Sequence, residues 1–310
     1  MQQDSDKYLN YILVTPAKNE EKKLPKLIQS IARQTVKPMV WVIVDDGSTD
    51  DTPNIIREAQ EKYDWVKSVR LEEHLRDLGK RYAYVCNTGF DFAIEYCKAH
   101  ANIHYDYIGN IDADMVLETK FFEDLIKEFK KNRKLGIASG SVYSNIRDKL
   151  ILEEDREDLP MGSPRLWRKE CFEETGGYPI TYSGDSVSNV LAKLRGWELK
   201  RFGKIKAIQA RKTSSAEGLW NGYKTHGISA YFRNYHPLFV LTKGLKYSFE
   251  SPFYIGIAYL YGYFSSVLRR MDKTDNEEIR DYYYHQKHKE AIEYYKNKIK
   301  NKLKWGRKSI

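Results

Sequence analysis

The sequence has few cysteines, no glycine-rich phosphate loop and no long apolar run. Its three cysteines, Cys86, Cys97 and Cys171, have neither the spacing of a zinc site nor that of a redox pair. We interpret them as buried thiols in a reducing compartment. Hydrophobic residues make up 41% of the 310 positions, so composition excludes a disordered chain, a collagen-like polymer and a disulfide scaffold.

Targeting and membrane-spanning signals are also missing. The first ten residues lack the basic-then-apolar order of a signal peptide. Residues 251–268 carry no charge, but Pro252, Gly256 and Gly262 interrupt them. A membrane span needs about 20 strongly apolar residues. We therefore expect this segment to be interfacial or part of a core.

Apolar runs typical of buried strands alternate with runs of helical period in the first half of the chain. The expected strands are 11–15, 40–44, 66–71 and 107–111, and the expected helices are 20–34, a helix from residue 52, 81–98 and 120–131. Thr52 is the predicted cap of its helix, with Pro53 at the first position. This order predicts an α/β fold with a mostly parallel sheet, helices on both faces and right-handed crossovers.

Polar and acidic residues follow three of these strands, at the sheet edge where ligands of such folds bind. They are residues 15–20, 45–50 and 112–114. Asp112 and Asp114 are so close that their charges disfavour one another unless a cation lies between them. Two carboxylates completed by phosphate oxygens are the usual site of Mg²⁺ or Mn²⁺. A capped turn is the alternative, but the position after a buried strand favours a metal.

Asp45 and Asp46 allow two interpretations. They could form the turn that Gly47 introduces, or one carboxylate could accept a hydrogen bond from a base N–H or a ribose hydroxyl. Without a glycine-rich loop, phosphate charge would be met by a metal and by basic side chains. Lys80 and Arg81 are candidates, although solvated charges at a helix start explain them equally well.

Together these segments resemble the family 2 glycosyltransferases of the GT-A fold. The resemblance rests on residues 14–20, 44–52 and 111–114, and on residues 166–177, which are similar to the R-x-x-F-x-x-x-G-G segment of that family. It covers about residues 8–212. It implies a nucleotide-diphosphate sugar donor, either a UDP- or a GDP-sugar, a divalent metal (Mn²⁺ or Mg²⁺) and inversion at the anomeric carbon.

The resemblance also implies roles for particular residues. Asp112 and Asp114 match the ribose and metal contacts, with Asp114 the more direct ligand. The residues expected to bind the donor nucleotide are Thr15, Pro16, Ala17, Glu20, Asp45, Asp46, Lys80, Arg81, Asp112 and Ala113.

An inverting transfer needs a carboxylate that takes the proton of the acceptor hydroxyl. Asp185 precedes a run of helical period and matches the base of the family by its spacing to Gly196; it could also cap that helix. The chain departs from the family twice. Ser186 stands where many relatives have a second acidic residue, and Gln209 stands where they often have a histidine. Arg211, beyond it, is a candidate diphosphate contact or a surface charge.

The last third of the chain is aromatic and basic. We expect helices at 244–249, 253–268 and 279–303, and from Arg269 onward the chain has 13 basic and 7 acidic residues. No nucleic-acid-binding signature is present. Basic charge beside aromatics suits an anionic membrane surface, and a helical subdomain with solvated lysines is the plainer alternative. His236 is expected to pack at a helix start.

We therefore predict a catalytic domain over 1–212, with a donor half to about 115 and an acceptor half from 116, followed by a helical extension over 213–310. The predicted activity is metal-dependent inverting transfer of a sugar to a glycan hydroxyl, on a lipid-linked acceptor, by a cytoplasmic protein peripheral at the inner face of the membrane. Transfer to a polyprenyl phosphate is one alternative, and a non-catalytic glycan- or membrane-binding scaffold is another. A nucleotidyltransferase would need a basic, glycine-rich loop that residues 15–20 do not supply.

Overall fold

The computed structural model describes residues 10–73, 80–146, 149–153, 156–209 and 218–306. The chain divides into two compact units, Met1–Thr213 and Ser214–Ile310. Each unit is described separately below.

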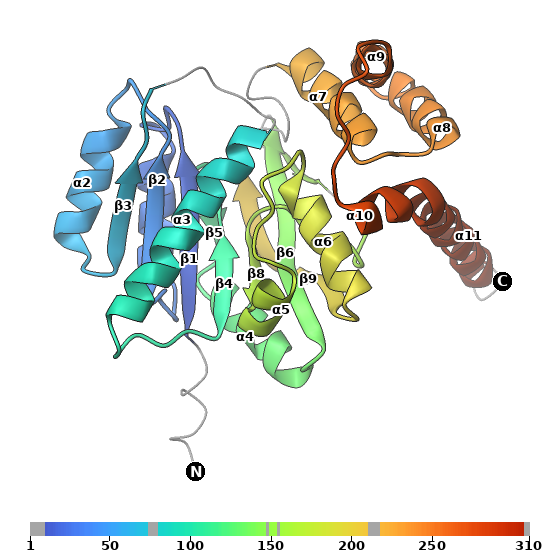
Figure 1. Cartoon of the computed structure of the whole chain (residues 1–310). Coiled ribbons are helices and arrows are strands. Elements are labelled where there is room, and N and C mark those ends of the chain that lie inside the picture. Colours follow the sequence, from blue (N-terminus) through green and yellow to red (C-terminus); the bar gives the residue numbers. More distant parts are fainter. Residues whose placement is uncertain (1–9, 74–79, 147–148, 154–155, 210–217, 307–310) are drawn as a thin grey trace. The chain divides into compact units, whose positions relative to one another are not determined.

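The first unit is built on a sheet in which the described strands have the order β3-β2-β1-β4-β8-β6-β9-β5, with β7 beside β6 (Figure 1). The strands are β1 Tyr11–Ala17, β2 Val40–Asp45, β3 Val66–Arg70, β4 Tyr107–Asn110, β5 Met115–Leu117, β6 Leu135–Ile146, β7 Lys149–Leu152, β8 Arg165–Arg168 and β9 Glu198–Gln209. The four strands expected from the sequence are therefore present and adjacent.

The expectation of a mostly parallel sheet holds only for its first half. Strands β1 to β4 pair in parallel. In the second half β8 is antiparallel to both β4 and β6, and β5 is antiparallel to β9. Only β6 and β9 run in parallel there.

Helices cover both faces of the sheet, as the alternation of elements predicts. They are α1 Leu24–Ala32, α2 Thr52–Lys62, α3 Lys80–Ala99, α4 Phe121–Lys131, α5 Lys169–Glu174 and α6 Gly184–Leu194. Helices α1, α2 and α4 contribute to one hydrophobic cluster, and α3, α5 and α6 to the other. The N-cap of α2 is Asp51 rather than Thr52, because Thr52 is already helical and its hydroxyl accepts a hydrogen bond from the Glu20 N–H.

The core is explained by the alternation of side chains along β1. Tyr11 and Leu13 belong to the cluster with α1 and α4, whereas Ile12 and Val14 belong to the cluster with α3. All four are fully buried. A strand buried on both faces is apolar at nearly every position, so this apolar run predicted a buried strand.

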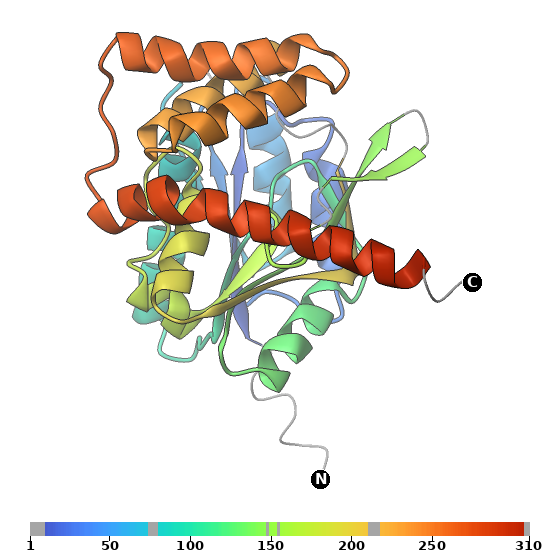
Figure 2. The same ribbon diagram turned by 90° about the vertical axis from the view of Figure 1, so that its right-hand side faces the viewer.

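The second unit is helical. Its elements are α7 Leu219–Phe232, α8 Pro237–Ser248, α9 Tyr254–Leu268, α10 Glu277–Asp281, a π-helical segment η2 Tyr282–Gln286 and α11 Lys287–Gly306. Helix α9 packs against α7 and α8 (Figure 2). A Cβ on Gly227 would collide with the Tyr259 carbonyl, and one on Gly262 with the Lys224 carbonyl, so these glycines allow α7 and α9 to approach closely.

Helix α9 confirms the helix expected over 253–268, whereas the other two expected helices differ from the observed ones. Helix α8 starts at Pro237 instead of residue 244, and the single helix expected over 279–303 is divided among α10, η2 and α11. The expectation failed because aromatic residues occupy both inner and outer positions here and blur the apolar period. No helix in the described part of the chain has the length and apolar character of a membrane span.

Gly89 gives a test of the packing between α3 and the sheet. An added Cβ would collide with Val14 and lie 2.8 Å from Val44 Cγ2. Although alanine favours a helix by about 1 kcal/mol, these stiff β-branched neighbours cannot move away. We expect Gly89→Ala to lower the free energy of unfolding by about 1–3 kcal/mol, measured by urea denaturation. Gly203→Ala, where a Cβ meets nothing within 4 Å, should stay within about 0.5 kcal/mol; equal effects would contradict the packing argument.

Candidate active site

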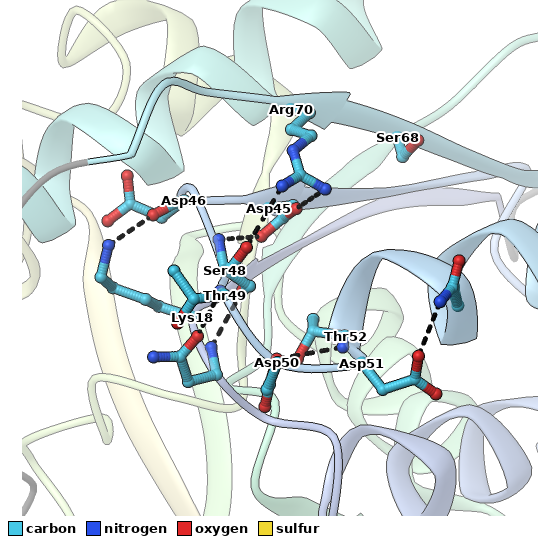
Figure 3. Close-up of polar contacts among 12 residues, drawn as sticks. Lys18, Asp45, Asp46, Ser48, Thr49, Asp50, Asp51, Thr52, Ser68 and Arg70 are labelled. Atoms are coloured by element: carbon cyan, nitrogen blue, oxygen red, sulfur yellow. Dashed lines mark hydrogen bonds and ion pairs between the residues drawn. The ribbon is translucent and has the colours of Figure 1, made fainter.

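The loops after β1 and β2 are joined into one surface. The Asp46 N–H donates to the Ala17 carbonyl at 2.8 Å, and the Asn19 N–H donates to Ser48 Oγ at 2.9 Å. This follows from the register of the two parallel strands, in which Ala17 lies opposite Asp45. Residues 15–20 and 45–50 therefore meet at the carboxyl edge of the sheet, where the sequence predicted them (Figure 3).

Asp45 is buried at this edge and is only partly used by the fold. Its Oδ1 accepts a hydrogen bond from the Ser48 N–H at 2.9 Å, and its Oδ2 lies 3.3 Å from Arg70 Nη1 (Figure 3). The ion pair is close, yet its geometry is not that of a hydrogen bond, and Oδ2 accepts none from the described residues. A buried carboxylate oxygen of this kind can accept an N–H from a ligand. The turn and the ligand interpretations of Asp45 are thus compatible.

Asp46 is paired with Arg81, which comes from the first turn of α3. The guanidinium donates from Nε at 3.1 Å and from Nη2 at 2.8 Å to Asp46 Oδ1. Lys18 Nζ donates to the Asp46 carbonyl at 2.7 Å (Figure 3). The structure therefore brings together a predicted nucleoside contact and a predicted phosphate contact, with a second cation beside them.

The remaining predicted residues of the first loop are largely inside the protein. The Thr15 hydroxyl is buried and accepts a hydrogen bond from Trp41 Nε1 at 2.8 Å. Glu20 is buried, and its Oε2 lies 3.0 Å from Lys23 Nζ. Ala17 ends β1, and Pro16 before it is partly exposed. The side chains of Thr15 and Glu20 therefore stabilise the protein interior beneath this edge of the sheet.

The connection from β4 to β5 holds the predicted acid pair. Asp112 accepts a hydrogen bond from the Tyr82 hydroxyl at 2.7 Å, and its own N–H donates to Ser163 Oγ at 2.7 Å. Burial, and then the Asp112 charge, raise the pKa of Tyr82 well above its ordinary value. Tyr82 therefore stays protonated at neutral pH and holds one carboxylate oxygen of Asp112 by donating to it.

Asp114 is buried and faces Gln209. Antiparallel pairing of β5 with β9 sets Met115 opposite Gln209, and Gln209 Nε2 lies 3.4 and 3.5 Å from the two Asp114 carboxylate oxygens. Ala113, between the aspartates, is buried in the core. The departure from the family at Gln209 thus falls directly beside the predicted metal ligand.

The acid pair fits a divalent cation that substrate oxygens help to coordinate. Among the described residues, no group of three or more His, Cys, Asp or Glu side chains could hold a metal. Mg²⁺ and Mn²⁺ nevertheless need only one or two carboxylates when a bound diphosphate supplies other oxygens. Asp114 and Asp112 are the residues that would hold it.

One short loop connects the acid pair to Asp185. In residues 160–163, the Gly162 carbonyl accepts a hydrogen bond from Asn110 Nδ2 at 3.2 Å, and Ser163 Oγ accepts from Asp112. On its other side, a Cβ on Gly162 would lie 3.0 Å from Asp185 Oδ2. Asp185 lies in the first turn of α6, is partly exposed, and follows Ser183, which has a left-handed backbone. The predicted base therefore lies against the loop that contacts Asp112.

Arg165, at the start of β8, supports this loop from inside the protein. Its fully buried guanidinium donates to the carbonyls of Met161 at 2.5 Å, Pro160 at 3.1 Å and Asp185 at 3.3 Å, and to Asn189 Oδ1 at 3.0 Å. Burial lowers the pKa of Arg165, and the Asp185 carboxylate acts against that shift. One side chain thus holds both the loop and the first turns of α6.

Lys80, Arg211 and Ser186 are the other residues that the sequence singled out. Lys80 is exposed, and its Nζ lies 5.8 Å from the centroid of the Tyr182 ring, in the segment before α6. This contact brings the start of α3 beside the Asp185 segment. Arg211 lies outside the described residues. Ser186 is partly exposed, next to Asp185.

Sequence reasoning missed four residues of the site: Tyr82, Asn110, Ser163 and Arg165. Only Arg165 left a signal, because an arginine at the start of the apolar run Leu166-Trp167 is unusual for a buried strand. The others are ordinary polar residues whose contacts are long-range in the sequence.

The role of Arg165 can be tested by unfolding. Arg165→Met leaves three carbonyls and the Asn189 amide oxygen without their donor, and a buried acceptor left unpaired costs about 1–3 kcal/mol. We expect the free energy of unfolding to fall by about 3–5 kcal/mol, with Arg165→Lys recovering only part because an ammonium lacks the planar fork. Urea denaturation measures both. Arg57→Met on the exposed side of α2 is the control, and a similar loss in it would refute this role.

Comparison with known proteins places the chain in a family. The model of glycosyl transferase family 2 matches residues 12–185. The 4,4'-diaponeurosporenoate glycosyltransferase of Staphylococcus haemolyticus is 29% identical over 133 residues, 42% of this chain and 31% of the relative. The chondroitin synthase of Escherichia coli is 30% identical over 184 residues, 54% of this chain and 24% of the relative. The chain thus matches less than a third of the length of these relatives.

Solved structures share the fold at low identity. One is TarS of S. aureus in complex with UDP-GlcNAc, with a TM-score of 0.52, 15% identity, and coverage of 83% of this chain and 73% of that one. Another is the mannosyltransferase PcManGT of Pyrobaculum calidifontis in complex with GDP-Man and Mn²⁺, with a TM-score of 0.52, 15% identity, and coverage of 81% and 69%. The predicted GT-A-like α/β fold is confirmed. The chain belongs to glycosyl transferase family 2.

Proposed function

We propose that this chain is a metal-dependent, inverting glycosyltransferase that moves a sugar from a UDP- or GDP-sugar to a hydroxyl of a glycan. One observation carries the proposal: the loop over residues 160–163 contacts Asp112 on one side and lies against Asp185 on the other. A metal-binding acid pair and a separate carboxylate are what such a transfer requires. The complexes of similar structures with UDP-GlcNAc and with GDP-Man and Mn²⁺ support the donor class.

In this proposal the first half of the sheet binds the nucleotide. Asp45 Oδ2, which is buried and accepts no hydrogen bond from the described residues, accepts an N–H of the base. Asp112, oriented by Tyr82, contacts the ribose. Lys80 and Arg81, at the start of α3, lie where cations can meet diphosphate charge.

The reacting end of the donor lies near the acid pair. A divalent ion held by Asp114 and Asp112 would neutralise negative charge on the departing diphosphate. Gln209 orients Asp114 through its amide. Asp185 takes the proton of the acceptor hydroxyl as that oxygen attacks the anomeric carbon from the side opposite the diphosphate, which inverts its configuration.

We further propose that the acceptor is lipid-linked and that the protein works at the inner face of the cytoplasmic membrane. Two observations support this part. The helical unit has large exposed apolar side chains on α8 and α9, and all three cysteines are buried free thiols, as a reducing compartment permits.

Asp185→Asn tests the base. The amide cannot take a proton, so we expect kcat to fall by about 10²–10⁴-fold, while the Kd for the donor, measured by calorimetry, stays within about twofold because Asp185 is not a donor contact. Asp91→Asn, on the exposed side of α3, is the matched control and should have normal kcat. Near-normal turnover in Asp185→Asn would refute the base and favour an acceptor that is already anionic, such as a polyprenyl phosphate.

The acid pair is tested by removing both carboxylates. In Asp112→Ala/Asp114→Ala we expect transfer to fall by at least about a thousandfold, which corresponds to about 4 kcal/mol of lost charge stabilisation. Wild-type protein treated with EDTA should lose activity and regain it with Mn²⁺ or Mg²⁺. Release of UDP or GDP from a panel of sugar donors is the measurement. Transfer that survives both treatments would refute the metal, and no turnover of any donor by the wild type would favour a binding scaffold.

A further inference from the structure

Helices α8 and α9 expose two apolar rows. On α8 and its C-cap the exposed residues recur every three or four positions, which places them on one side of the helix: Leu238, Leu241, Leu245 and Phe249. Helix α9 repeats the pattern with Tyr254, Ile257, Tyr261, Phe264 and Leu268. Five of these residues are at least 60% exposed: Leu238, Leu245, Phe249, Ile257 and Leu268 are 65%, 60%, 78%, 60% and 84%. We call these nine residues the apolar ridge.

The ridge is not the packing face of either helix. Helix α8 packs through Val240 and Gly244, where Leu260 of α9 fits against the glycine. Helix α9 packs through Ala258, Tyr259 and other buried positions. One side of each helix therefore packs inside the helical unit, and the other side is exposed although it is also apolar. An exposed apolar patch of this kind is typical of an interaction surface.

Charge at the ridge indicates an anionic partner. Residues 237–270 have four basic side chains, Lys243, Lys246, Arg269 and Arg270, and one acidic side chain, Glu250. Lys246 lies 3.8 Å from Glu250, and Arg269 and Arg270 are exposed at the end of α9. Acidic residues return only after α9, from residue 272.

We propose that the apolar ridge of α8 and α9 docks on an anionic lipid surface. A bilayer surface is apolar within and negative at its headgroups, which matches leucine, isoleucine and phenylalanine flanked by lysine and arginine. Tyr254 and Tyr261 suit the headgroup level. Helix α9 has 15 residues and is about 22 Å long, shorter than the roughly 30 Å hydrocarbon core. It therefore lies along the surface.

This docking surface is narrower than the one expected from the sequence, which took in all of residues 231–310. It also explains the uncharged segment 251–268, because that segment supplies one side of α9 to the helical core and the other side to the ridge. Docking needs neither donor nor metal, so it can be tested apart from sugar transfer.

The test is sedimentation of the full chain with vesicles, in the absence of nucleotide and metal. With 30% phosphatidylglycerol in phosphatidylcholine we expect binding that weakens at 0.5 M NaCl, because screening reduces the headgroup attraction. In Leu245→Ser/Ile257→Ser we expect the partition coefficient to fall at least about tenfold, since each lost side chain removes buried apolar area. No binding of the wild type to these vesicles would overturn the proposal.

The matched control is Leu150→Ser/Ile151→Ser on β7, where the same residue types are 56% and 51% exposed in the first unit. This variant should bind like the wild type. Equal losses in the two double variants would overturn the proposal. Circular dichroism of all variants shows that the fold is kept.

If the apolar variant fails to fold, a charge variant still tests docking on the lipid surface. Arg269→Glu/Arg270→Glu should lose binding to phosphatidylglycerol vesicles several-fold, with little change on pure phosphatidylcholine; unchanged binding to phosphatidylglycerol would overturn the proposal. Light scattering adds one further outcome. If the wild type is a dimer that Leu245→Ser/Ile257→Ser converts to monomer, the ridge is the interface with a second copy, and lipid docking is refuted.

Discussion

The buried guanidinium of Arg165 is the interaction on which the site depends. A buried charge is tolerated only where hydrogen bonds and a countercharge replace water, and Arg165 finds both in the loop over 160–163 and in the first turns of α6. Ser163 and Gly162 of the same loop then contact Asp112 and lie against Asp185. The loop that Arg165 supports thus lies against both Asp112 and Asp185, which are far apart in the sequence.

The two halves of the sheet position different residues of the proposed site. The parallel half places the loops after β1 and β2 at one edge, where Asp45 and Asp46 are held by Ser48, Arg70 and Arg81. The mixed half returns the chain through β8 and β9, so that Gln209 reaches Asp114. The mixed pairing therefore brings β8 beside β4 and Gln209 beside Asp114.

The helical unit has apolar and aromatic residues both in its packed interior and on its exposed surface. Glycines at 227 and 262 let α7 and α9 pack closely, and larger apolar residues of α8 and α9 are exposed. Tyrosine and phenylalanine occupy both sides, so the apolar period is weak; the bounds of α9 were predicted, but those of α8 and of the helices after α9 were not. Charge, apolar exposure and helix length together favour a lipid surface for the outer side.

The sequence by itself determined the first four strands, their helices and the edge that carries residues 15–20, 45–50 and 112–114, because strand period and strand ends are local properties of the chain. It also singled out Asp185. Only the tertiary structure decided that Arg165 supports Asp185, that Tyr82 holds Asp112 and that Gln209 faces Asp114. Those contacts join residues far apart in the chain, and which polar groups meet is set by strand order and packing, for which local sequence has no signal.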